Sequence, residues 1–71
     1  MTAVQTEVVP VRGMHCGGCE RTVADAVQAL PGVAGARADF VAEEVEVTYD
    51  PGRTGLDAIR AAVRDAGFTP A

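Results

Sequence analysis

The chain has 71 residues, of which 48% are apolar, and its formal net charge is −4. This length predicts one small domain over residues 1–71, and an acidic chain without a basic stripe is not expected to bind nucleic acid or an anionic membrane surface. No segment approaches the run of about 20 apolar residues that a membrane helix needs, so we expect no membrane insertion. Residues 1–7 hold neither a basic region nor an apolar run. We therefore expect no signal peptide and a cytoplasmic location, where thiols stay reduced.

The first half of the chain is typical of a strand followed by a helix. The strand is predicted over Thr6–Arg12, and Pro10 within it lacks a backbone donor, which suits an edge or irregular position. The helix is predicted over Glu20–Leu30, and the pair Pro31-Gly32 ends it. Its apolar residues recur at helical spacing: Val23, Ala26, Val27 and Leu30.

The second half predicts a hairpin, a second helix and a short final strand. Apolar and polar residues alternate over Ala34–Phe40 and again over Val45–Tyr49, which indicates two paired strands. Thr54 is the predicted N-cap of the second helix, and Gly67 is the residue expected to end it. Residues 68–71 leave room for only a short strand. The apolar face of the second helix consists of Leu56, Ile59, Ala62, Val63 and Ala66.

The order strand, helix, strand, strand, helix, short strand predicts an α+β fold, the ferredoxin-like βαββαβ sandwich with two helices on one face of an antiparallel sheet. The short last strand is expected to leave the first strand without a full neighbour on one side, which explains why Pro10 is tolerated there. Phe40 and Tyr49 are predicted to be core aromatic residues.

The only two cysteines form a Cys-x-x-Cys pair within the segment Gly13–Cys19. Two thiolates this close can chelate a soft metal ion, form a redox disulfide, or supply half of a four-sulfur zinc site. Gly17 and Gly18 allow a tight backbone between the sulfurs. We therefore expect Cys16 in a loop and Cys19 in the first helical turn, where unpaired N–H groups and the positive helix end favour thiolates.

Thiolate ligands are soft and favour Cu(I), whereas two sulfurs without a carboxylate in the loop leave zinc under-coordinated. His15 is predicted to be solvent-exposed, and the alternative is a third ligand that would suit zinc better. Met14 is predicted to fill a gap in the core rather than to bind metal. The polar residues of the first helix near the loop are predicted to face solvent or to form a docking surface: Glu20, Arg21, Asp25 and Gln28.

A Cys-x-x-Cys loop between a first strand and a first helix, in a chain of this length, forms a specific combination with three further segments. The four segments are Gly13-Met14-x-Cys16-x-x-Cys19, Leu30-Pro31-Gly32-Val33, Val45-x-Val47-x-Tyr49-Asp50-Pro51 and Ala66-Gly67-Phe68. Together they resemble the heavy-metal-associated domain family, which is found as small copper chaperones and as N-terminal domains of copper-transporting P-type ATPases. The resemblance covers essentially the whole chain.

The resemblance implies that Cys16 and Cys19 are metal ligands, that Met14 lies in the core beneath the loop, and that Phe68 packs near the site. It also implies a cytosolic Cu(I) metallochaperone, not an enzyme, which passes copper by thiolate exchange to the metal-binding domain of a copper-transporting P-type ATPase. Two positions depart from the common pattern. His15 stands where copper-handling members often have Thr, and Phe68 stands where bacterial chaperones often have Tyr.

Two alternatives stay open at this stage. One is a metal-binding regulatory domain of a P-type ATPase, and the other is a zinc- or mercury-binding member of the same family. We expect a monomer without metal, with a copper-bridged homodimer as an open alternative.

Overall fold

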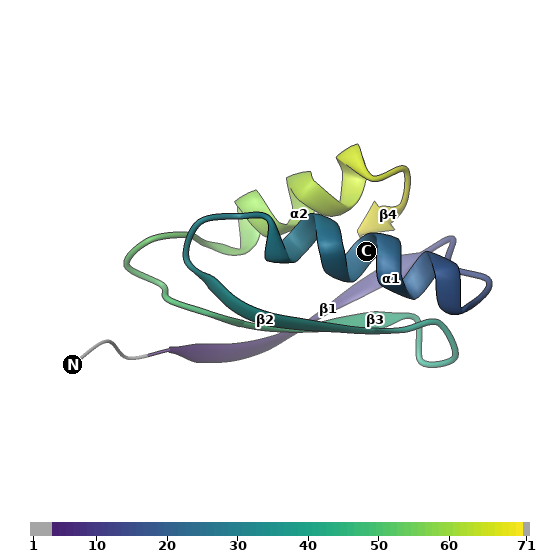
Figure 1. The fold of residues 1–71 in the computed structure, drawn as a ribbon, viewed down its shortest axis with the longest axis horizontal. Coiled ribbons are helices and arrows are strands. Elements are labelled where there is room, and N and C mark those ends of the chain that lie inside the picture. Colours follow the sequence, from purple (N-terminus) through teal and green to yellow (C-terminus); the bar gives the residue numbers. More distant parts are fainter. Residues whose placement is uncertain (1–3, 71) are drawn as a thin grey trace.

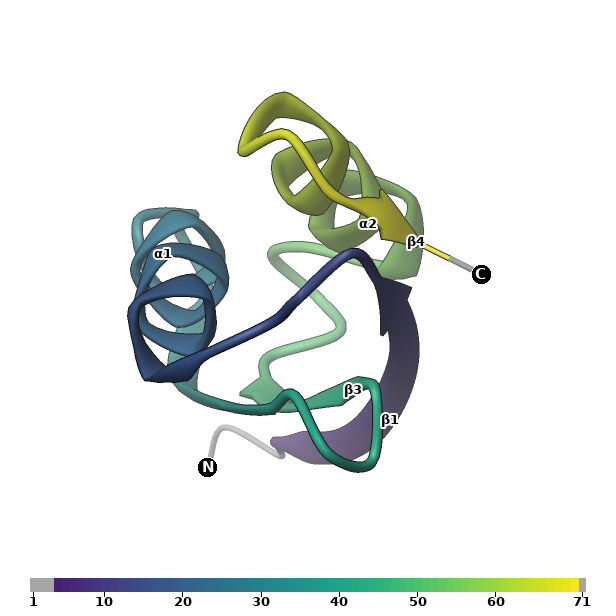
Figure 2. The ribbon, with the colours of Figure 1, turned by 90° about the vertical axis from the view of Figure 1, so that its right-hand side faces the viewer.

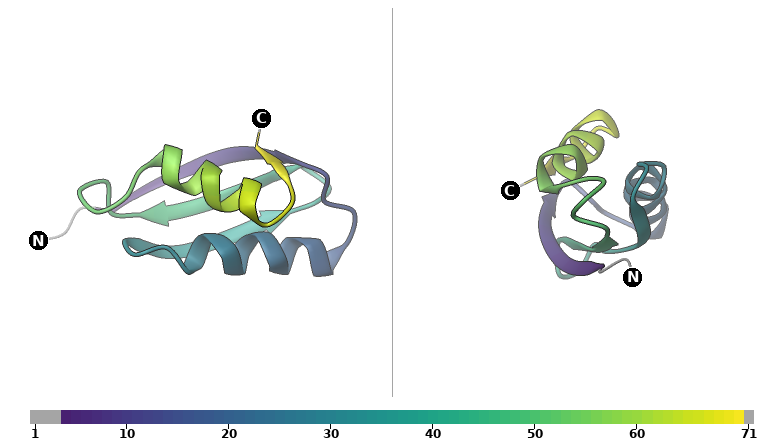
Figure 3. Two further views of the ribbon diagram at one scale, coloured as in Figure 1. Left: turned by 90° about the horizontal axis from the view of Figure 1, so that it is seen from above. Right: turned by 90° about the vertical axis from the view of Figure 1, so that its left-hand side faces the viewer.

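The computed structural model describes residues 4–70 and consists of a four-stranded antiparallel sheet with two helices on one face (Figure 1). The elements are β1 (Gln5–Arg12), α1 (Gly17–Gln28), β2 (Val33–Asp39), β3 (Glu44–Tyr49), α2 (Leu56–Asp65) and β4 (Thr69–Pro70). The strand order is β2-β3-β1-β4, and both helices lie side by side over the sheet (Figure 3). This confirms the expected ferredoxin-like sandwich. Within the described residues, neither helix is long and apolar enough to cross a membrane.

The core lies between the helices and the inner face of the sheet, and valine dominates it. Seven side chains are fully buried: Val11, Val23, Val27, Val45, Val47, Ile59 and Val63. Val23 and Val27 come from α1, Ile59 and Val63 from α2, so each helix contributes two residues one turn apart. Tyr49 is also buried, which confirms its prediction as a core aromatic residue.

Phe40 is not a core residue, and this prediction was wrong. Its side chain is 36% exposed, because β2 ends one residue earlier, at Asp39. The Asp39 carboxylate accepts hydrogen bonds from the backbone N–H groups of Val41 at 2.9 Å and Ala42 at 3.1 Å, which turns the chain at this point. Phe40 therefore lies in the turn rather than on the inner face of a strand.

The helix boundaries also differ from the predicted ones. Helix α1 begins at Gly17 instead of Glu20, since Gly17 and Gly18 both adopt helical geometry. It ends at Gln28 instead of Leu30. The N-cap of α2 is Gly55, so the prediction of Thr54 was wrong. Thr54 donates its backbone N–H to the carbonyl of Asp50 at 3.1 Å and thus belongs to the preceding turn.

The short strand β4 pairs only with Val11 and Arg12 of β1. Val11 donates its N–H to the Glu43 carbonyl at 2.8 Å, on the side toward β3. Because backbone groups alternate in direction along a strand, the nitrogen of Pro10 points away from β3. No described strand lies beside Pro10 on that side, as the sequence predicts, and its missing donor costs no hydrogen bond with β3.

Candidate metal centre

The two cysteines lie at the start of α1, at one end of the molecule (Figure 2). Cys16 is the N-cap residue with extended backbone angles, φ −160° and ψ 175°, and Cys19 lies in the first turn. The Cys16 carbonyl accepts hydrogen bonds from the N–H groups of Cys19 at 3.1 Å and Glu20 at 3.2 Å. This geometry confirms the expected placement of one cysteine before the helix and one inside it.

The two sulfur atoms face each other. Cys16 Sγ lies 3.6 Å from Cys19 Sγ, and both thiols are free. Cys16 is exposed, whereas Cys19 is half-buried and packs against the core. The pair therefore has one sulfur accessible to a second molecule and one anchored to the fold.

The start of the helix favours the ionised form of Cys16. The backbone N–H of Cys19, the Cys19 thiol and the backbone N–H of Gly18 lower the pKa of Cys16 below its ordinary value of 9.0, and the charge of Glu20 opposes them. The effect is that of backbone N–H groups at a helix N-terminus on a nearby anion. A thiolate is the form that binds soft metal ions.

The segment before the cysteines is held by packing rather than by polar contacts. Met14 is only 5% exposed and belongs to the core cluster, which confirms that it lies beneath the loop. Gly13 has φ +103°, and a Cβ there would lie 3.5 Å from the Phe68 ring. Phe68 thus packs against the core and beside Gly13, at the base of the loop that leads to Cys16.

Phe68 reaches this place through the end of α2. Gly67, with φ +98°, donates its N–H to the Arg64 carbonyl at 3.0 Å, and Phe68 donates to Val63 at 3.2 Å. These two hydrogen bonds form a Schellman motif, which confirms Gly67 as the residue that ends the helix.

His15 is exposed, and in the part of the chain that the structure describes, no three His, Cys, Asp or Glu side chains are grouped closely enough to hold a metal ion. His15 is therefore not brought together with the two cysteines as a third ligand in this conformation. Among residues 4–70, the candidate site therefore offers two sulfur donors.

Two polar residues of α1 hold the helix against the neighbouring hairpin. The Glu20 carboxylate accepts a hydrogen bond from the Phe40 N–H at 2.9 Å, and Gln28 donates to the Ala36 carbonyl at 3.1 Å. Arg21 and Asp25 are exposed, as expected for the solvent-facing side. The contact of Glu20 was not foreseen, because nothing in the sequence relates it to a residue twenty positions away.

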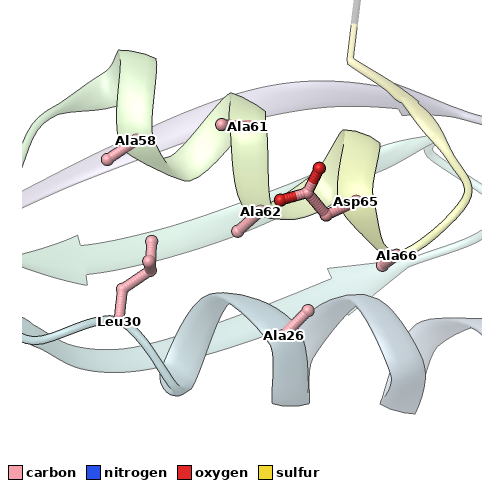
Figure 4. A pocket seen from close by; sticks show the side chains of 7 residues that line it. All are labelled: Ala26, Leu30, Ala58, Ala61, Ala62, Asp65 and Ala66. Carbon is pink, nitrogen blue, oxygen red and sulfur yellow. The ribbon is translucent and has the colours of Figure 1, made fainter.

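A separate groove of about 490 Å³ lies between α1 and α2 (Figure 4). Its walls are mostly alanine methyl groups: Ala26, Leu30, Ala58, Ala61, Ala62, Asp65 and Ala66. Asp65 is the one ionisable side chain lining it, so the groove has no set of donors for a metal ion. Among the described residues, the two thiols therefore remain the candidate metal ligands.

Comparison with known proteins supports a metal-binding interpretation. The model of the heavy-metal-associated domain family matches residues 8–69. The chain is 40% identical over 65 residues to the probable copper-transporting ATPase PacS of Synechococcus elongatus, covering 92% of this chain and 9% of the ATPase. It is 35% identical over 66 residues to the mercuric transport protein periplasmic component of Serratia marcescens, covering 93% of this chain and 72% of that protein.

Among solved structures, one titled as a CopZ metallochaperone superposes with a TM-score of 0.91 at 28% identity, covering 94% of this chain and 100% of that one. The chain spans less than a tenth of the length of the copper-transporting ATPases that it matches. The relatives therefore include both a chaperone of similar length and single domains of much longer transporters.

Proposed function

This chain belongs to the heavy-metal-associated domain family, and we propose that it binds Cu(I) through Cys16 and Cys19. The observation that carries the proposal is the pair of free sulfurs 3.6 Å apart, with a lowered pKa at the exposed Cys16. Two soft thiolates, with no third His, Cys, Asp or Glu grouped with them in residues 4–70, suit Cu(I) better than zinc, which takes four ligands in structural sites.

The sulfur separation has a consequence for the bound ion. A thiolate–metal bond is about 2.3 Å for zinc, so an ion in a straight line between two sulfurs needs them about 4.6 Å apart. At 3.6 Å the pair is within reach of one ion. A near-linear two-coordinate Cu(I) requires the sulfurs to separate by about 1 Å, and Cys16, as the exposed residue outside the helix, is the one free to move.

We further propose that the chain is a cytoplasmic metallochaperone rather than an enzyme, and that residues 1–71 act as one domain. With only two ligands, the bound ion is open to a third thiolate from a partner, which can bind before a chaperone sulfur leaves. The copper then passes between proteins without release as a free ion. The step parallels thiol–disulfide exchange, in which one sulfur is replaced through a mixed intermediate.

The proposed partner is the metal-binding domain of a copper-transporting P-type ATPase. A chain with net charge −4 docks best on a surface with excess positive charge. Its association is expected to weaken as added salt screens the charges. An association constant that is unchanged between low and high ionic strength would remove the electrostatic part of the proposal.

The test is an anaerobic competition titration of the reduced chain with Cu(I) and, separately, Zn(II). We expect one Cu(I) per chain, lost in Cys16→Ser and Cys19→Ser and kept in His15→Ala. A preference for Zn(II) that disappears in His15→Ala would instead assign the site to zinc. A chain that passes Hg(II) to an acceptor domain but fails to pass Cu(I) would instead favour the mercury-handling function that the Serratia relative suggests.

A second candidate function follows from the relatives themselves. The first three relatives are copper-transporting ATPases of which the chain matches less than a tenth, so we keep a regulatory metal-binding domain of such a transporter as the second candidate. The length of the natural reading frame distinguishes the two: a frame that continues into membrane-spanning segments would establish the transporter domain.

A further inference from the structure

Two of the exposed apolar side chains lie next to each other in the turn between β2 and β3. Phe40 is 36% exposed and Val41 is 80% exposed. The other large apolar side chains exposed in the described chain are Val4, just before β1, and Val8, in the middle of β1. We call the pair Phe40 and Val41 the apolar turn.

The apolar turn lies at the same end of the molecule as the thiols. Figure 1 shows the turn between β2 and β3 at the end where the segment joining β1 to α1 also lies, and Figure 2 views both from that end. A direct contact joins the apolar turn to the first turn of α1, because the carboxylate of Glu20, the residue after Cys19, accepts the Phe40 N–H at 2.9 Å. The first turn of α1 and the apolar turn are thus linked side by side.

Two further hydrogen bonds hold the loop between β2 and β3, one of them at the apolar turn itself. The Asp39 carboxylate accepts the N–H of Val41 at 2.9 Å, and the Glu43 carbonyl accepts the N–H of Val11 in β1 at 2.8 Å. Glu43 itself has φ 56°, a left-handed conformation that is uncommon for residues other than glycine. These contacts hold Phe40 and Val41 in place before any partner arrives, which lowers the entropic cost of binding.

The proposed copper transfer requires a partner protein to bind at the end of the molecule that holds the thiols and the apolar turn. An incoming thiolate must reach a metal ion at Cys16, so the partner's surface lies over the start of α1 and approaches the adjacent turn. Covering the water-exposed Val41 side chain with an apolar surface lowers the free energy. The carboxylates of Glu43 and Glu44 flank the turn and favour basic groups around that apolar surface.

We infer that the apolar turn is the second contact of the transfer complex, beside the thiols. Its occupant is a heavy-metal-associated domain of a copper-transporting ATPase that carries an apolar patch bordered by basic residues near its own thiol loop. Glu20 is the residue that positions the turn for this contact. The inference rests on the proposed function, because only metal transfer brings such a domain against this end.

The experiment measures Cu(I) transfer from the loaded chain to the metal-free domain of the 40% identical cyanobacterial ATPase, and mass spectrometry separates the two proteins. Val41→Ser is expected to lower the second-order transfer rate about threefold, and the double variant Phe40→Ser/Val41→Ser about tenfold. Val4→Ser is the matched control, since Val4 is 53% exposed and lies before β1. Its transfer rate is expected to equal that of the unmodified chain.

The outcomes separate the two proposals. If the unmodified chain binds Cu(I) but transfers none, the proposed function fails and this inference fails with it. If transfer occurs and Val41→Ser matches Val4→Ser, the function stands and the inference is wrong. Binding of the chain to phosphatidylcholine vesicles that Val41→Ser abolishes would assign the turn to a lipid surface and also overturn it. Thermal unfolding of each variant checks that the fold is intact.

Two variants of Glu20 test its positioning role. Glu20→Gln keeps an oxygen that can accept the Phe40 N–H, whereas Glu20→Ala removes it. Both remove the negative charge next to the thiols. We therefore expect Glu20→Ala to slow transfer and to speed hydrogen exchange of the Phe40 amide, and Glu20→Gln to restore both toward the unmodified values. Equal behaviour of the two variants would show that the charge acts and the hydrogen bond does not.

Discussion

The thiol of Cys19 lies 3.6 Å from that of Cys16, and the N–H of Cys19 is also the largest cause of the lowered Cys16 pKa. One residue therefore supplies both the second sulfur and the main stabilisation of the first as a thiolate. This arrangement follows from the spacing, because a residue three positions after an N-cap lies in the first helical turn, where its N–H points back toward the N-cap residue.

Replacing Cys19 by alanine is expected to raise the pKa of Cys16, because the thiol hydrogen bond is lost. The backbone N–H remains, so the pKa stays below 9.0. The pH dependence of Cys16 alkylation by iodoacetamide, followed by peptide mass, measures this change. Glu20→Gln serves as the opposite control and is expected to lower the pKa, since it removes the charge that opposes ionisation. A Cys19→Ala profile shifted to lower pH would contradict the assignment.

The lowered pKa also predicts how stability changes with pH. A thiol whose pKa is lower in the folded than in the unfolded state stabilises the fold fully above the unfolded pKa, and this contribution is lost as the pH falls through the folded pKa. The metal-free chain is therefore expected to gain stability relative to Cys16→Ser as the pH rises toward 9.0. Urea unfolding of both proteins at several pH values measures it. A difference that stays constant across that range would be inconsistent with the shift.

Access to Cys16 depends on a glycine. A Cβ on Gly18 would lie 3.7 Å from Cys16 Sγ, whereas one on Gly17 meets nothing within 4 Å. Gly18→Leu is expected to slow the reaction of Cys16 with a bulky disulfide reagent severalfold, because the side chain covers the sulfur. Gly17→Leu is the matched control and is expected to react at the unmodified rate. Equal slowing in both variants would point to a general effect on the helix.

Met14 tests the distinction between core residue and ligand. Met14→Leu conserves volume and is expected to cost less than about 1.5 kcal/mol of unfolding free energy. Met14→Ala leaves a cavity in a site that is only 5% exposed and is expected to cost about 2–5 kcal/mol. Urea unfolding measures both. If the thioether were a ligand, Met14→Leu would lose Cu(I) affinity while keeping its stability.

Gly32 is expected to be the most restrictive glycine for stability. It has φ +94°, and a Cβ there would lie 2.8 Å from the Cβ of Arg53. Gly32→Ala is expected to lose about 1–2 kcal/mol from the left-handed backbone and about 1–3 kcal/mol more from the clash. Gly67→Ala, with φ +98° and no atom within 4 Å, isolates the first effect. Equal losses in urea unfolding would show that Arg53 moves aside freely.

Most of the fold could be predicted because its signals are local. Period-two alternation predicts strands, and the helical spacing of Val23 with Val27 and of Ile59 with Val63 predicts the two buried helix faces. The errors fell where neighbouring hydrogen bonds decide the backbone. Asp50 holds Thr54 in a turn and leaves Gly55 as the N-cap, and Asp39 turns the chain before Phe40.

The sequence by itself determined the sulfur pair and its placement at a helix start, because a spacing of three residues places one cysteine at the N-cap and the other in the first helical turn. It also determined the apolar faces that bring helices and sheet together. Only the tertiary structure decided that Phe68 reaches Gly13, that Glu20 holds the Phe40 turn, and that His15 stays apart from a three-donor group in residues 4–70. These contacts join segments far apart in the chain, so their geometry depends on how the packed elements meet and on no local pattern.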